Sequence, residues 1–216
     1  LLPGYPQVLA GVKYKSKVAE FNELPQFPPA TLLSARLSLS KSEHIPVFVI
    51  DCPGLYHREG GPYMDALGRE WPDNALRFGL LSKIGAILSS DASPIAWQPH
   101  IAHCNDWQSG LTPAYLHYHA GKKAATVMTI HNLAFQGIFP PGSVVQLGLP
   151  PDSFDINGVE YYGNLSFLKA GLYHTDHITT VSPNYAEEIQ TESLGFGLQG
   201  LLAGRRQHIT GILNGI

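Results

Sequence analysis

The sequence is poor in the residues that define several large classes of protein. Only 14% of its 216 residues are charged, and Lys+Arg 14 against Asp+Glu 17 gives a formal net charge of -3 with a pI near 6.4. A chain with this balance has no general electrostatic attraction to nucleic acid or to an anionic membrane. The two cysteines, Cys52 and Cys104, are too few for a disulfide scaffold and form no CxxC pair. This usage indicates a reducing compartment and predicts a cytoplasmic protein.

No stretch of the sequence reaches the roughly 18 to 20 consecutive apolar residues of a membrane helix, and no segment repeats at a fixed period. We therefore expect neither a membrane span nor a solenoid. The sequence also has no initial Met, no basic leader and no signal-like apolar stretch, because residue 1 is Leu within the turn-rich run 1–6. We expect the chain to begin inside a longer protein.

What the sequence has in quantity is apolar residues, 44% of the chain, arranged in short runs between turn residues. A body of this mass buries roughly 70% of its unfolded surface, enough for a sizeable core. Runs rich in β-branched residues predict strands over 45–50, about 100–103, 124–130, 177–181 and 209–213. Helical spacing and capping signals predict helices over 74–88, from near 107 to 121, and over 165–173, 183–189 and 200–207.

Strands that alternate with helices of this length are typical of βαβ units. We therefore predict an α/β fold, a Rossmann-like parallel sheet with helices on both faces. Residues 1–30 are rich in Pro and Gly and are expected to be irregular or briefly extended. The long connection 53–72 is expected to be functional or mobile.

Polar residues follow almost every predicted strand. They are Asp51-Cys52, His103 to Asp106, His131-Asn132, Ser182 and Asn214. An open parallel sheet binds its ligands at the carboxyl ends of its strands, where loops diverge and helix N-termini present backbone N–H groups. These residues are therefore the first candidates for a site, although Ser182 is most simply a helix N-cap and Asn214 fits a turn with Gly215.

Two of these residues have both a structural and a functional interpretation. Asp106 precedes a predicted helix and could cap it, or it could accept a charge-assisted hydrogen bond from a sugar hydroxyl. His131 could be a hydrogen-bonded core histidine. With Asn132 it could instead form a neutral donor and acceptor pair that holds a polyol or stabilises a developing carbonyl or oxocarbenium charge.

A run of possible metal ligands surrounds Asp106. Its members are His100, His103, Cys104, Asp106, His117 and His119. No HExxH or CxxC spacing accompanies them, and residues 100 and 103 face opposite sides of a strand. No GxSxG, GxGxxG or Walker A sequence follows a strand either. We predict no metal and no cofactor, and a metal hydrolase stays an alternative that elemental analysis for zinc would test.

Seven motifs occur in a fixed order along the chain. They are Pro62-Tyr63, Asp73-Asn-x-x-Arg77-Phe78, His103-x-x-Asp106-Trp107, Thr129-Ile-His131-Asn132-Leu-Ala-Phe-Gln136-Gly137, Ser166-Phe-Leu-Lys169-Ala-Gly171-Leu, Thr180-Val-Ser182-Pro183-x-Tyr185-Ala and Ile212-Leu-Asn214-Gly215. This series resembles the N-terminal domain of bacterial glycogen synthases, close relatives of plant starch synthases, over essentially residues 1–216. The resemblance implies that 1–216 is the acceptor-side Rossmann-like domain of a two-domain glycosyltransferase, incomplete at both ends.

The resemblance also implies an activity. It is the transfer of glucose, with retention, from ADP-glucose to the non-reducing end of an α-1,4-glucan in glycogen biosynthesis, with no required metal. Asp106 and His131 resemble the family's catalytic contacts with the donor glucose. The residues that resemble its substrate-binding positions are Tyr63, Asn132, Asn214 and Gln136.

By the same resemblance, the family's Gly-rich phosphate loop would precede Leu1, and its catalytic Glu and phosphate-binding cations would lie in a C-terminal Rossmann-like domain beyond Ile216. The chain alone is therefore expected to be inactive. Positions 105 and 108 are Asn and Gln where many bacterial members have His, and neither is assigned a catalytic role. A non-catalytic glucan-binding module, a sucrose synthase or another related glycosyltransferase, and UDP-glucose as the donor all remain open at this point.

Overall fold

The computed structural model of the chain describes residues 1–40 and 43–215. The fold comprises two compact units, Leu1–Leu81 and Ser82–Ile216, and each is described by itself. Within the described ranges, no helix is long and apolar enough to cross a membrane.

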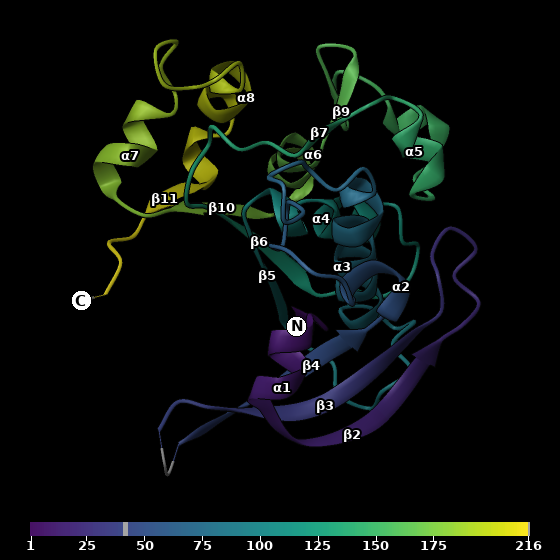
Figure 1. Cartoon of the computed structure of the whole chain (residues 1–216). Helices are drawn as coiled ribbons and strands as arrows, with labels where there is room; N and C mark the ends of the chain where they lie inside the picture. The colour runs from purple at the N-terminus through teal and green to yellow at the C-terminus, as the bar shows by residue number, and fades with distance from the viewer. Residues whose placement is uncertain (41–42, 216) are drawn as a thin grey trace. The chain divides into compact units, whose positions relative to one another are not determined.

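The first unit is built on a four-stranded mixed sheet with the order β1-β4-β3-β2 (Figure 1). Its elements are β1 (Leu2–Pro3), α1 (Pro6–Gly11), β2 (Val12–Phe21), β3 (Ala30–Ser38), β4 (His44–Asp51), α2 (Pro53–Tyr56) and the first part of α3 (Asn74–Leu88). β1 pairs with β4 in parallel, whereas β2–β3 and β3–β4 are antiparallel. The predicted strand 45–50 is confirmed as β4. Asp51 therefore ends a strand of this sheet and does not share the edge of the parallel sheet of the second unit.

The expectation that residues 1–30 are irregular is wrong. They contain α1 and the ten-residue strand β2, and Pro6 occupies the first turn of α1. β2 carries no apolar alternation because it is an edge strand, buried only at its ends, Val12 and Phe21. Its middle is exposed and holds three lysines. Its pairing with β3 is interrupted by two register shifts, and Tyr14 lies at a positive φ of 54°.

The 53–72 connection is held in place by a buried arginine. Arg77 of α3 is 1% exposed. Its Nε donates to the Leu55 carbonyl (3.0 Å), and its Nη1 donates to the Pro62 carbonyl (2.7 Å) and to Oδ1 of Asn74 (2.8 Å). A guanidinium buried in this way is stable only when it is hydrogen-bonded, and here two backbone carbonyls of the connection and the Asn74 side chain accept from it.

A second arginine closes the same connection. Arg58 donates to both carboxylate oxygens of Asp73 at 2.9 and 2.8 Å, and its guanidinium lies 4.8 Å from the ring centre of Trp71. Asp73 directly precedes α3, as predicted. Its carboxylate is thus engaged by Arg58 at the start of that helix.

The second unit contains a four-stranded, fully parallel sheet with the order β11-β10-β6-β5 (Figure 1). Its strands are β5 (Ile101–Asn105), β6 (Ala125–Ile130), β10 (His177–Thr180) and β11 (Ile209–Gly211). Each matches a predicted strand within a few residues. The predicted α/β fold with a parallel sheet is confirmed in this part of the chain.

The helices of the second unit follow the predictions with shifted ends. They are η1 (Trp107–Ser109), α4 (Leu111–His117), α5 (Ser143–Gln146), η2 (Pro151–Ser153), α6 (Phe167–His174), α7 (Pro183–Glu188), α8 (Gln199–Gly204) and η3 (Arg206–His208). Ser182 is the N-cap of α7, since its hydroxyl accepts from the Tyr185 N–H at 3.0 Å. α4 ends at His117 rather than near Gly121. Beyond its end the Leu116 carbonyl accepts from the His119 N–H (3.2 Å) and from Nζ of Lys123 (2.6 Å).

A small antiparallel sheet, absent from the predictions, interrupts the α/β alternation. It has the order β7-β9-β8 and consists of β7 (Ile138–Phe139), β8 (Glu160–Tyr161) and β9 (Asn164–Ser166). Strands of two or three residues carry too few positions for a periodic signal.

Side chains of the parallel sheet alternate between an apolar and a polar face. Met128, Ile130 and Ile178 are fully buried and pack with Leu168 and Leu172 of α6 in one core cluster. On the opposite face, polar groups meet across the strands. Nε2 of His103, Oγ1 of Thr129 and Oγ1 of Thr179 form a chain with separations of 2.6 Å at each step.

Two glycines allow α6 to approach the segment before α4. A Cβ at Gly110 would lie 2.1 Å from the Phe167 carbonyl oxygen, and one at Gly171 would lie 2.9 Å from the Gly110 carbonyl oxygen. These atoms are backbone, so a side chain at Gly110 could be accommodated only by separating the two elements.

We expect Gly110→Ala to lower the free energy of unfolding by about 2 kcal/mol, the usual scale for overpacking a core. Gly204→Ala is the matched control, because a Cβ there meets nothing within 4 Å, and alanine in α8 should raise stability by up to about 1 kcal/mol. Urea titration of both variants measures the difference. Equal stabilities would contradict the close contact.

His174, the last residue of α6, lies in a cluster of aromatic rings. Its ring centre is 4.5 Å from that of His117, and its Nε2 is buried without a hydrogen-bond partner in the described ranges. Burial, with smaller effects from His117 and Arg205, lowers the pKa of His174 to about 4 from its ordinary 6.5. The folded state therefore keeps this imidazole neutral.

This lowered pKa predicts a loss of stability in mild acid. Above about pH 6.5 the ring is neutral in both states, whereas between about pH 6.5 and 4 the unfolded chain takes up a proton that the folded chain does not. The free energy of unfolding should fall across this window, and His174→Phe should flatten the slope. The exposed His208→Phe is the control, and urea titrations at several pH values compare the three proteins. A slope that survives in His174→Phe would show that another group is responsible.

Candidate functional site

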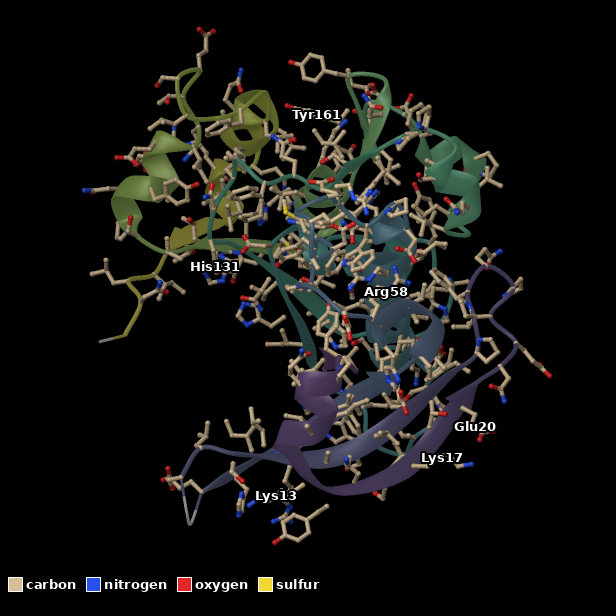
Figure 2. All side chains as sticks on the ribbon, viewed as in Figure 1. Lys13, Lys17, Glu20, Arg58, His131 and Tyr161 are labelled. Carbon is tan, nitrogen blue, oxygen red and sulfur yellow. The ribbon has the colours of Figure 1, made fainter. Side chains whose placement is uncertain are left out.

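The candidate site lies where β5 and β6 end. Asp106 directly follows β5, and His131 directly follows β6. The two strands are parallel with Asn105 paired to Thr129, so both residues reach the same edge of the sheet, where Figure 2 labels His131. The Oδ1 atom of Asp106 accepts from the backbone N–H of His131 at 2.8 Å and from that of Asn132 at 3.4 Å. The structure thus brings together the two residues predicted to be catalytic.

The alternative that Asp106 caps the following helix is wrong. Asp106 takes the N-cap position of η1, but its side chain makes no capping hydrogen bond there. Its backbone has φ 51° and ψ -174°, and its N–H donates to the Thr129 carbonyl at 2.9 Å. Such a conformation costs on the order of 1–3 kcal/mol outside glycine. The segment 131–137, between β6 and β7, is called the His131 loop. Charge-assisted hydrogen bonds from Asp106 to the backbone of this loop offset that cost.

The alternative that His131 is a core histidine is also wrong, because its side chain is exposed. Its Nε2 lies 3.0 Å from Oδ1 of Asn105. The backbone is therefore held by Asp106, and the ring contacts the residue immediately before Asp106. An exposed ring held in this way presents an edge to a ligand at the carboxyl end of the sheet.

The loop after His131 is anchored on both sides. Leu133 is fully buried, and its N–H donates to the Tyr185 hydroxyl of α7 at 3.0 Å. Oδ1 of Asn132 accepts from the Ala134 N–H at 3.0 Å, which closes a local turn and leaves the amide Nδ2 of Asn132 as its donor. These contacts fix the loop without using the side chain of His131.

Gln136 is buried, and its contacts are within the protein. Its Nε2 donates to the Phe196 carbonyl at 2.9 Å, and its Oε1 is buried with no hydrogen-bond partner among the described residues. The hydroxyl of Tyr161 donates to the same carbonyl at 2.5 Å. Phe196 has a positive φ of 46°, so two donors hold an unusual backbone conformation. The sequence does not predict the contact between Gln136 and the Phe196 carbonyl, because a pattern of side chains carries no information on which backbone carbonyl is bonded.

Asn214 lies apart from the contact between Asp106 and His131, and Tyr63 is described within the first unit. Asn214 is an exposed residue beyond β11, which is two strands from β6 and therefore about 10 Å away across the sheet. Tyr63 belongs to the first unit, where its ring packs 5.6 Å from that of Phe78 and its carbonyl accepts from Nδ2 of Asn74 at 3.0 Å. Tyr63 is 39% exposed.

A family model described as "Starch synthase catalytic domain" matches residues 1–204 of the chain. The chain belongs to that family.

Relatives of the chain include three bacterial proteins named glycogen synthase. Those of Nitrosomonas europaea, Nitrosomonas eutropha and Nitrosospira multiformis are 69%, 68% and 67% identical over 216 residues, which is all of this chain and 44%, 43% and 44% of theirs. The fold is similar to the catalytic domain of starch synthase IV from Arabidopsis thaliana, solved with ADP and acarbose, with a TM-score of 0.74 at 23% identity. That likeness covers 95% of this chain and 42% of the plant chain. The chain thus spans less than half the length of these relatives.

The candidate site offers hydrogen-bonding groups rather than a thiolate nucleophile. Burial raises the pKa of the Cys104 thiol, next to Asn105, to about 12, so this cysteine stays protonated at neutral pH. Residues 1–40 and 43–215 hold no group of three or more His, Cys, Asp or Glu placed to bind a metal ion. An imidazole and amides beside one carboxylate are suited to hold hydroxyl groups.

We expect Asp106→Gly to loosen the His131 loop, because it removes the carboxylate while glycine retains the positive φ. Protection of the His131 amide against hydrogen exchange should fall about tenfold, the equivalent of one hydrogen bond to a charged group. Asp106→Asn keeps an oxygen acceptor and tolerates the same backbone, so its protection should change less than about threefold. If both variants exchange as the unsubstituted chain does, Asp106 does not hold the loop.

Proposed function

We propose that this chain is the N-terminal, acceptor-side domain of a glycogen or starch synthase. The enzyme would transfer glucose, with retention, from ADP-glucose to the non-reducing end of an α-1,4-glucan in the cytoplasm. The contact of Asp106 with His131 at the carboxyl edge of the sheet carries the proposal, because it joins the two residues whose motifs match the family. The names of the bacterial relatives, and the ADP and acarbose of the plant structure, support the substrate classes.

In this proposal the donor glucose lies against the edge formed by Asp106 and His131. The exposed imidazole of His131 contacts the sugar near its reacting carbon, and Asp106 fixes the loop that presents it. Pre-organised dipoles of this kind stabilise the charge that develops at a sugar carbon as the glycosidic bond to the phosphate breaks. Nδ2 of Asn132 and the side chain of Asn214 supply further hydrogen bonds to hydroxyl groups. Tyr63 and Gln136 are assigned to substrate binding because their motifs match the family.

In this proposal, the groups that neutralise the nucleotide diphosphate belong to other parts of the enzyme. The charged side chain that bonds the backbone of the His131 loop is the carboxylate of Asp106, and a carboxylate repels phosphate. The positive groups and the catalytic Glu are therefore placed in a C-terminal Rossmann-like domain, the partner that completes the site. On this assignment the isolated 216-residue chain transfers no glucose.

A second candidate, glucan binding without catalysis, is favoured by a separate feature. A cavity of about 700 Å³ in the second unit is lined by Tyr161, Tyr162 and Tyr173. Figure 2 labels Tyr161, on the β8–β9 hairpin. Aromatic faces stack on sugar rings, so this cavity fits a saccharide chain as well as the sheet edge does.

Glucose transfer by the full-length parent protein distinguishes the two candidates. We expect the parent to incorporate radiolabelled glucose from ADP-glucose into glycogen, and Asp106→Ala and His131→Ala each to lower kcat by at least about 100-fold. The exposed Asn184→Ala in α7 is the control and should be unchanged. Near-normal turnover in the first two variants would remove Asp106 and His131 from the site. A parent that binds maltooligosaccharide but transfers no glucose would establish the second candidate.

A further inference from the structure

Asn105, which the family motifs leave unassigned, contacts the ring of His131. We propose that Asn105 is a positioning residue, whose amide oxygen holds the imidazole of His131 in one orientation and in the Nε2–H form. The inference rests on the proposed function, because it assigns this ring to the transfer site. It adds a residue that the family motifs leave without a role.

The register of the sheet places Asn105 beneath His131. Asn105 is paired with Thr129, so their side chains share one face of the parallel sheet. His131 lies two residues beyond Thr129, and the two-residue period of a strand returns its side chain to that same face. Oδ1 of Asn105 can therefore reach Nε2 of His131 at 3.0 Å.

Ser109 fixes the backbone from which Asn105 reaches the ring. The Asn105 N–H donates to Oγ of Ser109 at 2.7 Å, and the same hydroxyl donates to the Asn105 carbonyl at 2.8 Å. Both backbone groups of Asn105 are thus bonded within one turn of chain. The amide begins from a fixed position, which a positioning role requires.

The chemistry of the contact decides where the proton sits. A carbonyl oxygen only accepts hydrogen bonds, so the ring nitrogen facing it must carry hydrogen. In the neutral ring, Nε2 is then the donor and Nδ1 keeps its lone pair as the acceptor. Asp106, the charged side chain bonded to this loop, meets the His131 backbone and not its ring. Consecutive residues 105 and 106 therefore fix the ring and the backbone of His131 separately.

Nitrogen NMR of the ¹⁵N-histidine-labelled 216-residue chain tests the assignment directly. We expect His131 in its neutral form to be mainly the Nε2–H tautomer. Asn105→Leu, which has a similar volume but no acceptor, should lower the ratio of the Nε2–H to the Nδ1–H form by about tenfold, the equivalent of one hydrogen bond. Asn105→Asp keeps an oxygen acceptor and should retain the tautomer. A major Nδ1–H form in the unsubstituted chain, or a ratio unchanged in Asn105→Leu, would overturn the proposal.

A second measurement uses the full-length parent protein, so that the test does not depend on one variant or on the isolated chain. Asn105→Leu should lower kcat about 10- to 100-fold with KM changed less than about threefold, because the ring is misplaced rather than lost. Asn105→Asp should retain more activity than Asn105→Leu, and its added carboxylate should move the acid limb of the kcat profile to higher pH by favouring imidazolium. Asn184→Asp, which adds the same charge to exposed α7, should leave that limb in place.

The two measurements separate this inference from the proposed function. A parent without glucose transfer, but with the expected tautomer change, would leave the role of Asn105 intact and remove the reaction assigned to the site. An active parent in which both Asn105 variants match the unsubstituted enzyme in kcat and pH profile would overturn the role of Asn105 alone.

Discussion

Parallel pairing of β5, β6 and β10 is the constraint on which the candidate site depends. The register aligns Asn105 with Thr129 and Thr129 with Thr179. Because side chains alternate between faces, a slip of one residue would turn Met128 away from the core and, in the same step, carry Asp106 away from the His131 amide. Burial of the apolar face therefore fixes the register, and the register delivers the polar residues to one edge. Core packing and site geometry are consequences of one arrangement, so neither can change alone.

Both units fix a functional or connecting segment by bonding side chains to its backbone. In the second unit, Asp106 and Tyr185 bind amide groups of the His131 loop. In the first, Arg77 binds carbonyl groups of the 53–72 connection, which was expected to be functional or mobile. Backbone atoms are present whatever the side chain is, so such anchors hold a loop while leaving its own side chains available for ligands. Anchoring the backbone while leaving the side chains available suits a site whose exposed residues must keep one geometry.

Sequence reasoning identified the elements with strong periodicity and the polar residues at their ends. The strand before His131, the helix capped by Ser182 and the pairing of Asp106 with His131 at one edge all follow from patterns that local physics enforces. It failed where tertiary contacts replaced local signals. β2 has no alternation because it is an edge strand, and the ring contact of Asn105 requires the register of two strands. The bond from the Gln136 amide nitrogen to the Phe196 carbonyl is likewise a contact that no side-chain pattern encodes.

The open edge of β2 has a consequence for association between chains. A ten-residue edge strand would ordinarily offer a template for cross-β pairing with another molecule. Here Lys13, Lys15 and Lys17 would place like charges opposite one another in an antiparallel copy centred on Lys15, and the positive φ of Tyr14 interrupts the regular strand backbone. Figure 2 labels Lys13 and Lys17 along this strand. The exposed lysines and the irregular backbone, which leave β2 without an apolar alternation, thus also disfavour its pairing into fibrils.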